Sequence, residues 1–171
     1  MKNRFIKGHY MSHCLEMLIN ALGQSQSSSM FELLKTQLTD NNWVEVGDNA
    51  IFKCTDDGLT LTFNVDDILS KIEMLAPKKY FQLWIESNVP SMQGLILKPQ
   101  LIKALGTPVA CLEITQQSKQ EIQLLYNKID YWLSIKCQAD DIVSVTLLIP
   151  SLIPDSIRYN QVPIRTSHSK N

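Results

Sequence analysis

Glycine is scarce in this sequence, and no two glycines lie close together. The six glycines are scattered singly, so no glycine-rich loop is present to cradle a phosphate group. With seven prolines in 171 residues, the chain is also unlike fibrous or low-complexity proteins. Hydrophobic residues make up 44% of the sequence, which argues against intrinsic disorder. The length is that of about one domain with a sizeable core.

Paired cysteine motifs are absent as well. The four cysteines are Cys14, Cys54, Cys111 and Cys137, and no C-x-x-C spacing occurs among them. In a chain of this size such scattered cysteines are typical of buried small hydrophobic residues in a reducing compartment. We therefore expect neither a disulfide scaffold nor a zinc site.

Histidine is missing from the body of the chain. His9 and His13 lie near one end and His168 near the other, so no Ser-His or Cys-His catalytic arrangement is indicated. His9 and His13 could share a helix face beside Cys14, but no fourth metal ligand is in sight. We expect no metal, no cofactor and no enzymatic activity.

Long apolar runs and a strong net charge are both lacking. No segment approaches the roughly 18 to 20 apolar residues that span a bilayer. His13, Glu16 and Asn20 interrupt the one apolar stretch near the N-terminus, so no signal-peptide core is expected. The formal net charge is -1, which gives no reason to expect nucleic acid or an anionic membrane as a partner. The sequence predicts a cytoplasmic protein.

Hydrophobic spacing divides the first half into helices and strands. Apolar residues at helical spacing predict a helix over 11–22 that ends at Gly23, and a second over 30–38 with Ser29 as its cap. Strands are expected at 43–46, 50–54 and 59–65, the last in strict alternation. Segments 56–58 and 66–67 supply aspartate-rich turns.

The second half repeats this plan. A helix over 99–105 ends at Gly106, and strands are expected at 109–114, 122–126, 133–137 and 142–149. With an offset of 74, segment 58–74 falls on 132–148 with five identities, at Leu59/Leu133, Asp66/Asp140, Asp67/Asp141, Ile68/Ile142 and Ser70/Ser144. This indicates a duplication, the alternative being two similar hairpins in one sheet.

We therefore predict an α+β fold of two helix-plus-antiparallel-meander repeats with an N-terminal helix. The expected divisions are an N-terminal helix and linker at 1–29, a first repeat at 30–90, a second repeat at 91–154 and a polar tail at 155–171.

Acidic residues are concentrated in the first repeat. Residues 31–75 hold nine acidic and three basic residues, a net charge of -6, which could dock a basic partner. The alternative is a sheet that keeps its wet face charged. The aspartate pairs are expected to serve turns, because neighbours on a strand point to opposite faces. Trp84, Trp132 and Tyr131 could anchor an interface but fit a core better. The candidate partner-binding residues are Trp43, Glu45, Asp48, Asp56, Asp57, Asp66 and Asp67.

One motif points to a known group of proteins. The helix before Gly106 ends in Leu105-Gly106-Thr107-Pro108, and Tyr126, Asp130 and the segments 133–135 and 141–145 follow it. This arrangement resembles bacterial immunity-type proteins, in which a helix ending in L-G-x-P precedes a meander. It is also similar to the BamE-like fold and to β-lactamase inhibitor protein, a tandem pair of such units. The likeness covers about residues 31–150, although the first repeat lacks the L-G-x-P motif.

The resemblance implies a small binding protein that neutralises a cognate bacterial toxin by occluding its active site or an essential surface. The toxin would be a basic protein, and neither nucleic acid nor membrane would be involved. Two other functions stay open: a structural or scaffold subunit that acts through homo-oligomerisation, and a small enzyme.

Overall fold

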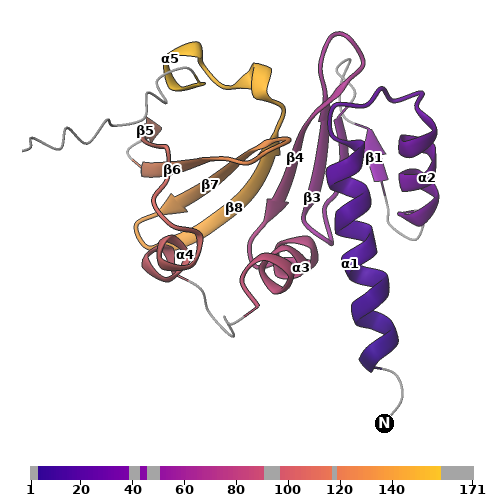
Figure 1. Ribbon diagram of the computed structural model, residues 1–171, viewed down its shortest axis with the longest axis horizontal. Coiled ribbons are helices and arrows are strands. Elements are labelled where there is room, and N and C mark those ends of the chain that lie inside the picture. The colour runs from indigo at the N-terminus through magenta and orange to yellow at the C-terminus, as the bar shows by residue number, and fades with distance from the viewer. Residues whose placement is uncertain (1–3, 39–42, 46–50, 91–96, 117–118, 159–171) are drawn as a thin grey trace, which may run out of the picture.

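A computed structural model describes residues 4–38, 43–45, 51–90, 97–116 and 119–158 (Figure 1). In chain order the elements are α1 (Arg4–Ala21), α2 (Ser29–Gln37), β1 (Trp43–Glu45), β2 (Ile51–Cys54), β3 (Leu59–Phe63), β4 (Leu69–Leu75), α3 (Lys79–Asn88), α4 (Lys98–Leu105), β5 (Ala110–Gln116), β6 (Lys119–Asn127), β7 (Trp132–Gln138), β8 (Asp141–Leu148), the 3₁₀ helix η1 (Pro150–Leu152) and α5 (Asp155–Arg158).

The strands form one antiparallel sheet in the order β1-β2-β3-β4-β8-β7-β6-β5. Each half of the chain contributes a four-stranded meander, and the two meanders meet where β4 pairs with β8. A helix precedes each meander, α2 the first and α4 the second. The predicted α+β fold, two helix-plus-meander units with an N-terminal helix, is therefore confirmed. The unit boundaries stay a prediction, and the predicted tail 155–171 begins with α5.

Local sequence explains most of these elements, but β4, α3, η1 and α5 were not predicted. Ser28, not Ser29, caps α2: its hydroxyl accepts a hydrogen bond from the backbone N–H of Phe31 at 3.2 Å. Helix α3 was not predicted. It buries Tyr80, Phe81 and Trp84 among its residues, and it packs against α1 and β4.

One side of the sheet carries the main core. In β3, Leu59, Leu61 and Phe63 are buried while Thr60 and Thr62 between them are partly exposed, as the alternation predicted. The predicted strand over 59–65 is too long, because the chain turns after Phe63 and leaves Val65 exposed instead of on the buried face. The ring of Phe63 meets that of Phe31 from α2 edge-on, with centroids 4.8 Å apart. In Figure 1, α1 and α2 lie beside the first meander and α4 lies below β7 and β8. The helices therefore cover this side of both meanders.

The two hairpins β3–β4 and β7–β8 share an irregularity at matching positions. The register shifts between Thr62 and Phe63 in one hairpin and between Lys136 and Cys137 in the other, 74 residues later. β-Bulges are conserved among related structures, so a bulge at the same position of two hairpins is expected when one is a copy of the other. The shared bulge supports a duplication.

The predicted alignment nevertheless slips by one residue in the second strand of each hairpin. Leu59 pairs with Met74, whereas its counterpart Leu133 pairs with Leu147, so β4 matches β8 at an offset of 73. The predicted equivalences Ile68/Ile142 and Ser70/Ser144 are therefore wrong. A one-residue slip moves side chains to the opposite face, so burial of the apolar set decides the register.

Candidate functional site

The two meanders differ in what packs over the side of the sheet opposite the main core. In the second meander, the C-terminal segment of η1 and α5 lies over it (Figure 1). There a second apolar cluster forms from Leu125, Trp132, Leu148 and Ile153, with Ala110, Leu112 and Ile157 packed against it. This face is therefore closed by the protein's own chain.

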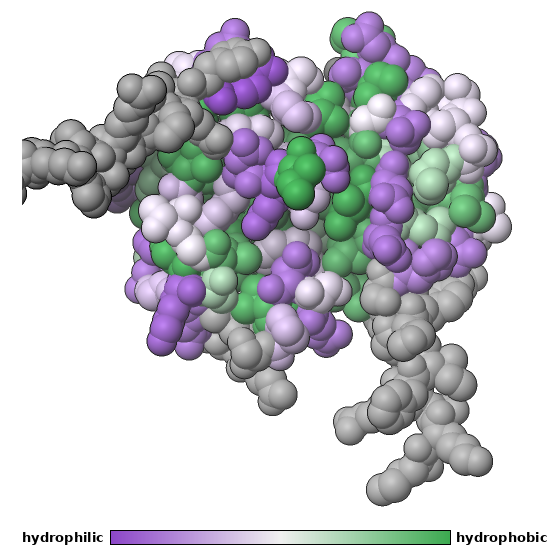
Figure 2. Space-filling model, viewed as in Figure 1, coloured by the Kyte–Doolittle hydropathy of each residue, from purple (hydrophilic) through white to green (hydrophobic). Residues whose placement is uncertain are grey.

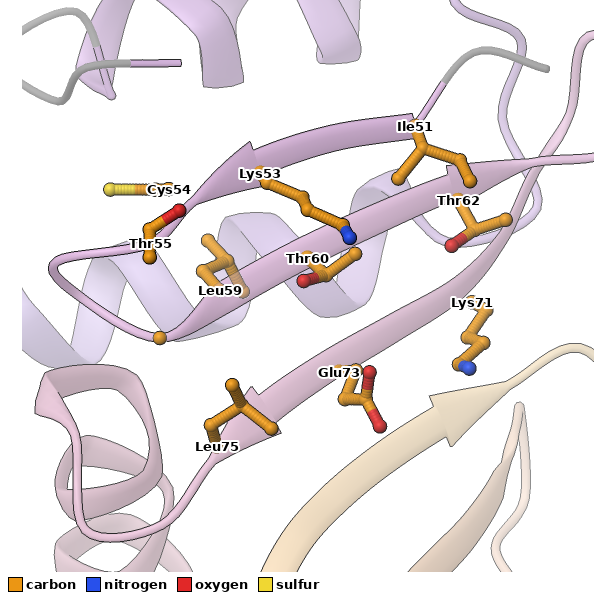
Figure 3. Close-up of a pocket in the computed structure, with 11 residues that line it drawn as sticks. Ile51, Lys53, Cys54, Thr55, Leu59, Thr60, Thr62, Lys71, Glu73 and Leu75 are labelled. Atoms are coloured by element: carbon orange, nitrogen blue, oxygen red, sulfur yellow. The ribbon is translucent and has the colours of Figure 1, made fainter. Parts of the chain in front are cut away.

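Within the residues that the structure describes, no segment packs over the corresponding face of the first meander. A depression of about 420 Å³ lies on β2, β3 and β4, and we call it the open face (Figure 3). Seven of its lining side chains project from the three strands to one side of the sheet: Ile51, Lys53, Thr60, Thr62, Lys71, Glu73 and Leu75. Cys54, Thr55, Gly58 and Leu59 complete the lining at the β2–β3 end.

Strand register places these residues in two rows. Ile51 pairs with Thr62 and Thr62 with Lys71, which forms the first row. The second row runs from Lys53 through Thr60 to Glu73. Because alternate residues share a face, the same pairing that buries Leu59 and Leu61 turns both threonines toward solvent. The open face thus follows directly from the core of the first unit.

The open face carries charges of both signs over a hydroxyl floor. Glu73 is half-buried, and the Ser144 hydroxyl from β8 donates to its Oε1 at 3.4 Å. Within the described residues, neither Lys53 nor Lys71 lies within 4.0 Å of a carboxylate. The ammonium groups of Lys53 and Lys71 can therefore bind a carboxylate of a partner, and the carboxylate of Glu73 can bind a cationic group.

The predicted aspartate pairs lie at the two ends of this face. Asp56 and Asp57 form the β2–β3 turn, where Asp57 pairs with Lys79 at 3.3 Å. Asp66 and Asp67 form the β3–β4 turn, where an Asp67 carboxylate oxygen accepts a hydrogen bond from the Ser25 hydroxyl at 3.2 Å. The five residues of β3, at about 3.3 Å each, place the turns about 17 Å apart. The prediction that these pairs serve turns is confirmed, and the acidic residues form two groups instead of one patch.

The other predicted binding residues lie near the sheet edge. Trp43 and Glu45 belong to β1, where they pair with Cys54 and Phe52 respectively. Asp48 lies outside the described residues.

The aromatic candidates belong to the interior. Trp84 is buried in the main core and Trp132 in the second cluster, as the core interpretation predicted. Tyr131 is half-buried, and burial together with the nearby Asp130 charge raises the pKa of its hydroxyl.

The cysteine prediction holds for part of the set. Cys54 and Cys137 are buried and Cys14 is half-buried, but Cys111 is exposed on β5. All four are free thiols, and burial raises the pKa of the Cys14, Cys54 and Cys137 thiols. His13, which was considered as a metal ligand, lies 3.9 Å from a carboxylate oxygen of Glu16, and both side chains are exposed. The part of the chain that the structure describes holds no group of three residues able to bind a metal ion.

Sequence reasoning missed the basic and acidic residues of the open face itself. Thr60 and Thr62 were placed on a wet face by their alternation, but Lys71 and Glu73 were not connected with them. The alternating burial of β4, in which Ile72 and Met74 are buried, carries the same signal. Reading 69–75 as a strand would have placed Lys71 and Glu73 beside the threonines.

Fold and site together define an α+β protein of two fused helix-plus-meander units with one closed and one open face. Neither a family model nor a curated protein matches the sequence. Among solved structures, a DUF4309 family protein (YjgB) from Bacillus subtilis is similar, with a TM-score of 0.49 and 16% identity. The match covers 83% of this chain and 97% of that one. Within the described residues, no helix has both the length and the apolar character needed to cross a membrane.

Proposed function

We propose that this protein is an immunity-type binding protein, which neutralises a cognate bacterial toxin by occluding its active site or an essential surface. The observation that carries the proposal is the open face. The C-terminal segment covers this side of the second meander, and no described residue packs over the depression on the equivalent side of the first meander. A rigid sheet with a shallow, mixed-charge depression suits the docking of a macromolecule.

Charge favours a basic partner. Asp56 and Asp57 lie at one end of the open face and Asp66 and Asp67 at the other, with Glu73 between them. Carboxylates so arranged speed the approach of a cationic protein. Lys53 and Lys71 favour a partner that places a carboxylate against the open face, because any other partner would leave their ammonium groups buried without a counter-charge. This increases specificity. Binding of this kind involves no cofactor or nucleic acid, and we expect it to occur in the cytoplasm.

Co-expression with the product of the adjacent gene tests the proposal. We expect that product to slow growth when expressed alone and growth to recover when this protein is present. Calorimetry on the two purified proteins should then show a one-to-one complex whose association weakens with salt. Absence of binding would contradict the proposal. A stable homodimer that buries the open face would instead support the scaffold alternative.

A further inference from the structure

Two turns from different halves of the chain emerge from the same end of the sheet. The paired residues Thr62, Lys71, Leu148, Trp132 and Asn127 form one continuous row across β3, β4, β8, β7 and β6. The β3–β4 turn (64–68) and the β6–β7 turn (128–131) both lie beyond this row on the same side. Their centres are three strand spacings apart, or about 14 Å at about 4.8 Å per spacing.

Each of these turns exposes a large hydrophobic side chain at its tip. Val65 is 95% exposed and Ile129 is 101% exposed, and the next value among the large hydrophobic side chains that the structure describes is 49%, at Leu33. Leu152 of η1, which follows β8 at this same end, is 47% exposed. Turn tips ordinarily carry polar residues, and nothing in the fold requires an apolar side chain at either tip. Figure 2 shows other hydrophobic residues on this face as well, including a band near the middle of the view.

Charged residues flank both tips. Asp66 and Asp67 follow Val65, and Asp130 follows Ile129; all three are exposed. Lys128, on the other side of Ile129, has its ammonium 6.0 Å from the centre of the Tyr126 ring. Apolar anchors within a charged rim are the arrangement of a protein interface. An anionic membrane would repel the three carboxylates, so a bilayer fits this end poorly.

We propose that this end of the sheet, the turn end, anchors the partner by inserting Val65 and Ile129 into two apolar pockets about 14 Å apart, rimmed by basic residues that meet Asp66, Asp67 and Asp130. The proposal rests on the proposed function and extends it. It gives the partner a chemistry that the open face does not specify, namely paired apolar pockets with a basic border. It also assigns a binding role to the second unit, since Ile129 belongs to the β6–β7 turn.

Serine substitutions test the turn end without disturbing the fold. Val65→Ser and Ile129→Ser remove only exposed side chains, so the thermal midpoint of each variant should match that of the wild type. Calorimetry with the product of the adjacent gene should show affinity reduced about tenfold by each change and about a hundredfold by both, because distant sites contribute independently. Leu33→Ser on α2, outside both turns, removes a half-exposed hydrophobic side chain and is the control that should bind like the wild type.

The possible outcomes separate the two proposals. If the wild type binds the adjacent gene's product and the double variant binds it equally well, the turn end is not an anchor, while the proposed function stands. If the wild type does not bind that product, the proposed function is contradicted, and so is the anchoring role of Val65 and Ile129 that depends on it. Flotation with vesicles of phosphatidylcholine and phosphatidylserine is the third measurement. Wild-type binding to vesicles that is lost in the double variant would show a membrane-inserting end and overturn the protein-partner proposal.

Discussion

The backbone N–H of Ile149 donates to the carbonyl of Ser70 at 3.1 Å, across the joint between β8 and β4. A second hydrogen bond runs from the N–H of Ala76, which follows β4, to the carbonyl of Val143 in β8, at 2.9 Å. It is the counterpart of the first bond, with the donor and acceptor strands exchanged. Both acceptors are the residues skipped at the bulges, and both donors follow the end of the opposite strand. The joint is therefore two-fold symmetric in its backbone, like an interface between two identical subunits.

The joint should make the two units unfold together. Ile72 is fully buried where β4 meets β8, opposite Leu147. We expect Ile72→Ala to lower the free energy of unfolding by about 2–5 kcal/mol, because it leaves a cavity in the shared core. Urea unfolding followed by tryptophan fluorescence and by circular dichroism should give coincident curves for the wild type. Leu33→Ala, at an exposed site, should change stability by less than about 0.5 kcal/mol. Two separate transitions would show that the units are energetically independent.

Two glycines offer a matched test of packing at the β2–β3 turn. Gly58 and Gly106 have φ values of 69° and 86°, so alanine strains the backbone at both. At Gly58 a new Cβ would also lie 2.4 Å from Cβ of Lys78, whereas at Gly106 it would meet no atom within 4 Å. We expect Gly106→Ala to cost about 1 kcal/mol and Gly58→Ala at least about 2 kcal/mol. Thermal unfolding of the two variants measures these losses. Equal losses of stability would show that the β2–β3 turn can move to accommodate the new Cβ at position 58.

Stability should fall in alkaline solution through Cys137. Burial raises the pKa of this thiol from 9.0 to about 11, so the folded protein holds the proton more tightly than the unfolded chain. The stabilisation is complete below pH 9 and is lost as the pH rises toward 11. At 1.36 kcal/mol per pKa unit, the loss amounts to up to about 3 kcal/mol.

Urea unfolding at several pH values between 8 and 11 measures this loss. Cys137→Ala should unfold more easily at pH 8 but show a shallower decline above pH 9. Cys111→Ala, at an exposed position, should keep the wild-type slope. Parallel slopes in all three proteins would exclude Cys137 as the titrating group.

A bulky residue on the floor of the open face should block binding. Thr60 is partly exposed in the centre of the depression, between Lys53 and Glu73. We expect Thr60→Arg to weaken the complex with the adjacent gene's product at least about tenfold, because the longer side chain occupies the docking volume. Ser87→Arg, on the exposed side of α3, adds the same charge elsewhere and should bind normally. Unchanged affinity of Thr60→Arg would place the interface on another surface.

Local sequence signals were sufficient for much of the first unit. The alternation in 59–65 predicted which residues of β3 face the core, and the aspartates of 56–58 and 66–67 predicted its turns. They also predicted a helix before each meander. These features depend on residues a few positions apart, whose backbone preferences and side-chain directions operate before any tertiary contact forms.

Long-range features could not be read in the same way. The sequence comparison aligned Ser70 with Ser144, but the strand register matches Lys71 with Ser144. Identical residue types favoured the alignment of Ser70 with Ser144. The burial of Ile72 and Val145 favours the alignment that matches these two residues with each other. Packing decides such cases, because a slipped strand would expose its apolar side chains.

The sequence by itself determined the helix before each meander, most of the strands and the aspartate-rich turns, since all of these rest on local periodicity and turn chemistry. It missed α3 and β4. Only the tertiary structure decided that β4 pairs with β8, that the C-terminal segment covers one meander and not the other, and that Val65 and Ile129 emerge at the same end. These arrangements depend on hydrogen bonds and apolar contacts between residues distant in the sequence, such as Ser70 and Ile149. No local preference specifies such a contact, because it forms only when two distant faces bury one another.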